Sequence, residues 1–249
     1  MINKTSLTVL MLFLLLCSQQ INAQIFNKLN VGIDGGIQFT DIQDSRMFSK
    51  NGIGFTAGGF AEIPLNPVLN FRLGLYLDKR NFNLNKAWVI QDAIAPFYVG
   101  KASYYYENVD YSVNYLTIPA SFLYMKGDKR IKIFIQVNIY LSLLASANQD
   151  GYSDLYISPA DTAAFKTPEW KIAGLQKESM SGNVSDVFNS YDFGLNLFIG
   201  AMYAITEKLS IKLSPGITYS TANVWSNPTR TARWSTIFKI NTGVVYKLK

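Results

Sequence analysis

The ionisable side chains of this sequence of 249 residues are spread singly rather than grouped into a catalytic or metal-binding motif. The absence of histidine excludes a Ser-His-Asp triad, Cys-His catalysis and a histidine-ligated metal site. The only cysteine, Cys17, excludes an intrachain disulfide. Carboxylate or Ser-Lys chemistry stays open, but no residue pair marks it. We therefore expect no catalytic site and no enzymatic activity.

Charged residues of both signs recur on the polar side of stretches in which polar and apolar residues alternate. They are Asp34, Glu62, Arg72, Asp78, Arg80, Lys132, Asp192, Lys212 and Lys239. Opposite charges on neighbouring strands can pair, and a buried unpaired charge is costly. We expect a structural ion-pair plug that comprises Glu62, Arg72, Asp78, Arg80, Lys132, Asp192, Lys212 and Lys239, with Glu62 and Arg72 as its best pair. A polar path through the protein is the alternative.

One acidic stretch, DGYSDLY, invites comparison with calcium-binding loops. Asp150 and Asp154 lie in it and Asp161 follows. Carboxylates at alternate positions bind calcium in EF-hand loops, but this spacing matches no complete loop and lacks the closing glutamate. We interpret the stretch as a solvated loop and predict no metal site and no cofactor.

The element that best reveals the fold is RIKIFIQVNIYLSLL, residues 130–144. Every second residue from Ile131 to Leu143 is aliphatic, and the intervening face carries polar and aromatic side chains. Strand side chains alternate between two faces, and globular strands usually have about five or six residues. Alternation of the same kind occurs in residues 30–39, 55–63, 69–80, 111–125, 191–205, 209–219 and 238–248. These stretches predict eight strands, and a change of apolar phase near Tyr115 and Leu116 suggests a bulge.

The connections between these strands alternate in length. Short turns are expected at residues 64–67, 127–129 and 206–208, and long loops at 40–51, 81–110, 147–190 and 223–235. This is the layout of a bacterial outer-membrane barrel with periplasmic termini. The polar faces are rich in Gly, Ser and Asn, which suits a narrow interior filled by side chains. We predict an all-β protein, a monomeric eight-stranded antiparallel transmembrane β-barrel with up-and-down meander topology. A soluble secreted barrel is the alternative.

The N-terminus resembles a secretory signal peptide. Lys4 precedes the apolar stretch 7–16, and Ala23 offers a small residue before a cleavage site. We therefore divide the chain into a signal peptide, residues 1–23, and an outer-membrane barrel domain, residues 24–249. A lipoprotein acylated at Cys17 is disfavoured because Leu16 is a poor match to the small residue required. The net charge of +6 is scattered, so we expect no nucleic-acid partner.

Aromatic residues in the predicted loops offer material for a binding surface, because Tyr and Trp are enriched at interfaces. They are Trp88, Tyr104, Tyr105, Tyr106, Trp170, Trp225 and Trp234. The three tyrosines could instead extend the barrel wall above the membrane or lie in its interfacial belt.

Three stretches together resemble the PorT-like outer-membrane β-barrel family of Bacteroidota. They are GFAEIPL (59–65), YLTIPASFLY (115–124) and DFGLNLFIGAMYAITEKLSIKL (192–213). The namesake of that family supports a secretion system, and the family supplies no catalytic residues. The resemblance implies a non-enzymatic outer-membrane barrel that is accessory to secretion or envelope assembly. The aromatic residues of the long extracellular loops favour a scaffold that binds a partner with those loops. A narrow channel or small-ligand transporter is the alternative.

Overall fold

A computed structural model describes residues 29–44, 48–90, 103–156, 176–227, 232–234 and 237–248. Eight strands form a closed antiparallel barrel, which confirms the predicted fold. They are β1 (Asn30–Thr40), β3 (Phe48–Pro64), β4 (Leu69–Ile90), β5 (Ser103–Gly127), β6 (Ile131–Tyr156), β9 (Tyr191–Ala204), β10 (Leu209–Ser220) and β12 (Ile237–Lys247). Each strand pairs with the next, and β1 pairs with β12 to close the barrel. The predicted signal peptide lies outside the described residues.

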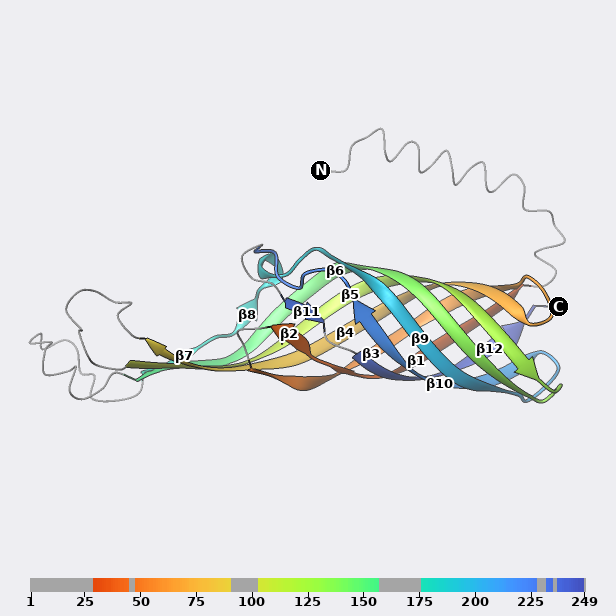
Figure 1. Cartoon of the computed structure of the whole chain (residues 1–249), viewed down its shortest axis with the longest axis horizontal. Coiled ribbons are helices and arrows are strands. Elements are labelled where there is room, and N and C mark those ends of the chain that lie inside the picture. The colour runs from red at the N-terminus through yellow and green to blue at the C-terminus, as the bar shows by residue number, and fades with distance from the viewer. Residues whose placement is uncertain are drawn as a thin grey trace, which may run out of the picture.

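Smaller elements lie at one end of the barrel, on the left of Figure 1. β2 (Ile42–Asp44) and β11 (Ala232–Trp234) form a separate two-stranded sheet. β7 (Gln176–Ser179) and β8 (Gly182–Asn183) pair with β6, and a short 3-10 helix, η1, covers Ser185–Val187. No helix in the described ranges is long and apolar enough to cross a bilayer.

The outer surface of the barrel carries a belt of aliphatic side chains. On β6, Ile139 is 64% exposed and Leu143 is 44% exposed, whereas the intervening Tyr140 and Ser142 are buried. Similar exposed residues occur on β4, β9 and β10. Exposed apolar surface on this scale requires an apolar solvent, and a closed barrel is one of the two structures whose backbone groups are all paired in lipid. The predicted assignment of the two faces of these strands is therefore confirmed.

The strands β4, β5 and β6 extend far beyond this belt (Figure 1). β5 has 25 residues and β6 has 26, whereas about 9–11 residues suffice to cross a membrane. The prediction of loops over residues 81–110 and 147–190 was therefore wrong in extent, because β4 continues to Ile90 and β5 begins at Ser103. The strands continue because β5 stays paired on both edges, with β4 as far as Ile90 and with β6 as far as Tyr156, so backbone groups there still find partners.

The chemistry of the two faces inverts where β5 leaves the membrane. On the short-turn side of this point, Ile118 and Phe122 face outward and Thr117 and Ser121 face the lumen. On the other side of it, toward the start of β5, outward positions are polar. The lumenal positions there are the buried residues Val109, Tyr111, Val113 and Tyr115. Within the membrane, the outer face of the wall is apolar. Beyond the membrane, the inner face is apolar and the outer face is polar, as in a soluble barrel.

The irregularity predicted near Tyr115 and Leu116 is confirmed by a register shift between β5 and β6, but the inversion of the two faces explains the change of apolar phase. β5 itself keeps strict alternation of buried residues through this point. The register between β5 and β6 does shift between Asn114 and Tyr115, but the residue left without a partner in that register is Ala145 of β6. The apolar phase of β5 changes because its surroundings change from lipid to water.

Candidate functional site

The lumen is crossed by two clusters of buried charges. The lower charge cluster consists of Asp34, Glu62, Arg72 and Lys212, and its members come from β1, β3, β4 and β10. Glu62 and Arg72 are direct cross-strand partners, so the register of β3 and β4 brings them together. Arg72 donates to Glu62 Oε2 from Nε at 3.0 Å and from Nη2 at 2.6 Å. Lys212 pairs with Asp34, whose other cation, Arg72, lies 3.9 Å away.

Polar and aromatic neighbours complete the lower charge cluster. The amides of Asn30 and Asn70 donate to Glu62 Oε1, and Gln136 accepts from Arg72 Nη1 at 3.2 Å. The Arg72 guanidinium also lies 3.9 Å from the centre of the Phe60 ring. A buried ion pair is stable only when its remaining hydrogen-bonding positions are also satisfied. These contacts meet that condition for Glu62.

The upper charge cluster consists of Asp78, Arg80, Asp192 and Lys239. Arg80 bridges the two carboxylates, with Nη1 2.6 Å from Asp192 Oδ2 and Nη2 3.2 Å from Asp78 Oδ2. Lys239 Nζ lies 3.2 Å from Asp78 Oδ1. The sequence predicts these residues for the plug but does not specify which of them pair.

The surroundings of the upper charge cluster satisfy its remaining oxygens. Gln38 donates to Asp78 at 2.8 Å, Tyr140 donates to Asp192 at 3.0 Å, and Ser220 also donates to Asp192. Each of the two clusters contains two acids and two bases and is electrically neutral. Between the two clusters lies a cavity of about 40 Å³, which is lined in part by Tyr76. A cavity of this volume has room for only a few water molecules. The two clusters therefore leave little open space in this part of the lumen.

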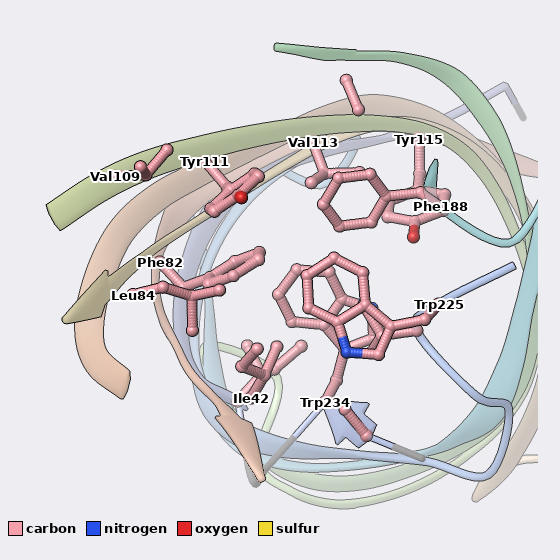
Figure 2. Close-up of a cluster of buried hydrophobic side chains, with 14 residues drawn as sticks. Ile42, Phe82, Leu84, Val109, Tyr111, Val113, Tyr115, Phe188, Trp225 and Trp234 are labelled. Carbon is pink, nitrogen blue, oxygen red and sulfur yellow. The ribbon is translucent and has the colours of Figure 1, made fainter. Parts of the chain in front are cut away.

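A hydrophobic cap fills the lumen above the upper charge cluster (Figure 2). Its buried residues are Ile42, Phe82, Leu84, Val109, Tyr111, Val113, Tyr115, Ala147, Phe188, Val224, Trp225, Ala232, Trp234 and Ile237. Phe82 stacks on Tyr111 with ring centres 5.0 Å apart, and Trp234 meets the same Phe82 edge-on at 5.4 Å. The Arg80 guanidinium lies 5.2 Å from the Trp234 ring, which joins the cap to the charges beneath.

Trp225 and Trp234 correct the predicted binding surface. The sequence places them in an exposed loop, but they are only 1% and 2% exposed. Above the membrane the lumen is apolar, so the largest apolar side chains of the surrounding loops fold inward and bury their surface there. Residue type alone predicted their position in a loop but not their direction.

The other aromatic residues of the predicted surface lie on strands or outside the described ranges. Trp88 is on β4 and is the cross-strand partner of Tyr105 on β5. Tyr104 and Tyr106 belong to the same strand, so these tyrosines extend the barrel wall, which was the alternative interpretation. Trp170 lies outside the described residues.

Lys132 is not a member of either charge cluster. It is half-buried at the short-turn end of the barrel, where it lines an open cavity, and no carboxylate of the described residues pairs with it. The prediction that it belongs to the ion-pair plug was therefore wrong. Asp34, a polar-face charge that was not assigned to the plug, is the carboxylate that pairs with Lys212 instead.

The acidic stretch around Asp150 also differs from its predicted setting. Asp150 and Asp154 lie on β6 rather than in a loop, and Asp161 lies outside the described residues. Within the ranges that the structure describes, no group of three or more His, Cys, Asp or Glu side chains is placed to hold a metal ion.

Comparison with solved structures finds other bacterial outer-membrane barrels. Neisserial surface protein A matches with a TM-score of 0.43 and 14% identity, over 88% of this chain and 97% of its own. OprG from Pseudomonas aeruginosa matches with a TM-score of 0.40 and 10% identity, over 88% of this chain and 95% of its own. Ail of Yersinia pestis matches with a TM-score of 0.39 and 9% identity, over 89% of this chain and 99% of its own. A search of curated proteins finds no match.

A family profile described as "Outer membrane protein beta-barrel domain" matches residues 18–226, which is most of the chain. The matched range contains seven of the eight barrel strands and both carboxylates of each charge cluster. The lipid-facing belt, the closed strand order and this match agree, and the chain belongs to the outer membrane protein beta-barrel domain family.

Proposed function

We propose that this protein is a non-conducting, non-enzymatic outer-membrane scaffold. It binds an envelope protein with its extended wall, the part of β4, β5 and β6 that lies beyond the lipid-facing belt. The observation that carries the proposal is a contrast between the lumen and the wall. The lumen is filled by two charge clusters and the hydrophobic cap, whereas β4, β5 and β6 continue well past the lipid-facing belt (Figure 1). The membrane anchor does not need this extension, and binding residues are often carried by surface segments that a rigid scaffold positions.

The outward face of the extended wall favours binding of a partner that has basic or hydrogen-bonding groups. Asp110 on β5 and Asp150 on β6 are direct cross-strand partners, and both are exposed. Like charges placed opposite each other destabilise a sheet, so a cationic partner group would relieve their repulsion. Asn83 donates to Asp110 at 2.9 Å beside them, and a shallow cavity of about 350 Å³ lies over the same residues.

The resemblance to the PorT-like family narrows the proposal to a partner in secretion or envelope assembly. The membrane part of the barrel supports a monomer, because each of its strands already pairs on both edges. A narrow channel is the second candidate. The filled lumen argues against it, since a solute would have to displace both buried charge clusters and the cap.

Site-specific photo-crosslinking tests the proposed binding surface. Cys17 lies in the predicted signal peptide, so a cysteine introduced elsewhere would be the single thiol of the mature chain. A crosslinker attached at Asn148→Cys, which lies beside the same cavity and leaves Asp110 and Asp150 in place, is expected to yield a discrete protein adduct in the native membrane. Ile139→Cys on the lipid face and Lys208→Cys in a short turn are the controls. Equal adducts at all three positions, or none at Asn148→Cys, would contradict the proposal.

A further inference from the structure

We propose that the short-turn end of the barrel is a binding site for a small organic oxyanion with a short apolar stem, open to the periplasm. This end contains a cavity of about 280 Å³ that is separate from the extended wall. Four cationic side chains line it: Lys129, Arg130, Lys132 and Lys247. The inference does not depend on the proposed scaffold function.

The charge balance of the lumen is the first argument. The two acids and two bases of the lower charge cluster neutralise one another, and the same holds for the upper charge cluster. Glu62, which lines the deep end of the cavity, is already paired with Arg72. Among the described residues, no carboxylate pairs with any of the four cavity cations. The cavity is therefore positive above a neutral floor, and a concave site with low-dielectric walls concentrates such a field.

The strand geometry is the second argument. Lys132 follows the alternation of β6 and lies on the same face as the buried Phe134, so its side chain is directed into the lumen. Lys247 likewise shares the lumenal face of β12 with Val245. Lys129 and Arg130 come from the turn between β5 and β6. Like charges held in one cavity repel one another, and a bound anion would relieve that repulsion.

The remaining walls and the volume define the ligand. Met125, Met202 and Val245 supply a buried apolar surface beside the cations. A water molecule occupies about 30 Å³ of liquid, so the cavity accepts a head group with a few carbons but not a lipid chain. Arg and Lys both make charge-assisted hydrogen bonds to carboxylates and phosphates. The structure thus fits a short-chain alkyl phosphate or carboxylate.

Isothermal titration of the purified full chain in non-ionic detergent tests this site with butyl phosphate as the probe. We expect butyl phosphate to bind more tightly than inorganic phosphate, butanol not to bind, and the affinity to fall as salt is added. Lys132→Gln combined with Lys247→Gln is expected to weaken binding by about tenfold or more, because the loss of even one charge-assisted contact is worth about a factor of ten.

The matched control combines Lys126→Gln with Lys208→Gln, which removes the same charge from the same end without touching the cavity lining. Heat-dependent gel migration shows whether each variant is folded, and Lys247→Gln alone, at an exposed position, replaces the double variant if that variant does not fold. Retained affinity in the control and lost affinity in the cavity variant support the site. No heat from the wild-type protein at millimolar probe, or equal loss in both variants, would overturn it.

Discussion

Replacing Arg80 with methionine is expected to lower the free energy of unfolding by about 3–5 kcal/mol, the usual cost of removing one partner from a buried ion pair. Arg80 is the only link between Asp78 and Asp192 that the described residues provide. Without it Asp192 keeps only neutral hydroxyl donors, from Tyr140 and Ser220, and its charge stays buried. Asp78 keeps Lys239 and is affected less.

Reversible urea unfolding in detergent micelles measures this effect. Lys79→Met is the matched control, because Lys79 is the next residue on β4 but has its side chain on the outward face, and its change should stay within about 0.5 kcal/mol. Adding Asp192→Asn to Arg80→Met should recover at least about 1 kcal/mol, since it removes the unpaired charge. Equal losses for Arg80→Met and Lys79→Met would show that the charge clusters do not stabilise the barrel.

Truncating Phe82 to alanine is expected to cost about 3–5 kcal/mol and to loosen the hydrophobic cap. Phe82 is 1% exposed and lies at the centre of the cap, within ring-contact distance of Tyr111, Phe188, Trp225 and Trp234. The resulting void is bordered by rings on several elements, so it cannot close by the movement of one side chain (Figure 2). Trp225 and the short strand β11, which carries Trp234, should therefore become more accessible to solvent.

Acrylamide quenching of tryptophan fluorescence reports this loosening. In a Trp88→Phe, Trp170→Phe background only Trp225 and Trp234 emit. We expect quenching to increase in Phe82→Ala and to stay unchanged in Phe193→Ala, where the ring faces lipid and is 49% exposed. If the two tryptophans were already quenched strongly in the wild-type protein, the cap would not be closed.

The strands within the membrane could be predicted from the sequence because lipid imposes a strict rule on them. Every second residue from Ile131 to Leu143 contacts the bilayer, and each must be apolar whatever the rest of the chain does. The pairing of Glu62 with Arg72 was predictable for a related reason, since a short hairpin fixes its own register.

The hydrophobic cap could not be predicted in the same way. It joins residues from β2, β4, β5, β6, β11, β12 and the segments around Phe188 and Trp225, which alternation within one strand does not bring together. The phase change at Tyr115 and Leu116 was the one local signal of it. A bulge and a change of solvent produce the same pattern in a single strand, and the structure separates them by showing that β5 keeps its alternation.

The length of the strands beyond the membrane was also hidden from sequence reasoning. There the outward face consists of residues such as Asn83, Asp110 and Asn148, which are more typical of turns and loops than of strands. The backbone ladder that keeps them in strands depends on three neighbouring segments being extended at once.

Recording from single proteins in a planar lipid bilayer tests directly whether the lumen is sealed. A parallel gel of the same sample shows that the inserted protein is folded, and a porin recorded in the same bilayer shows that conductance can be detected. The two neutral charge clusters beneath the hydrophobic cap predict a trace without stable open steps in the wild-type protein. Stable, ion-selective steps from the folded wild-type protein would contradict a filled lumen and would favour a channel.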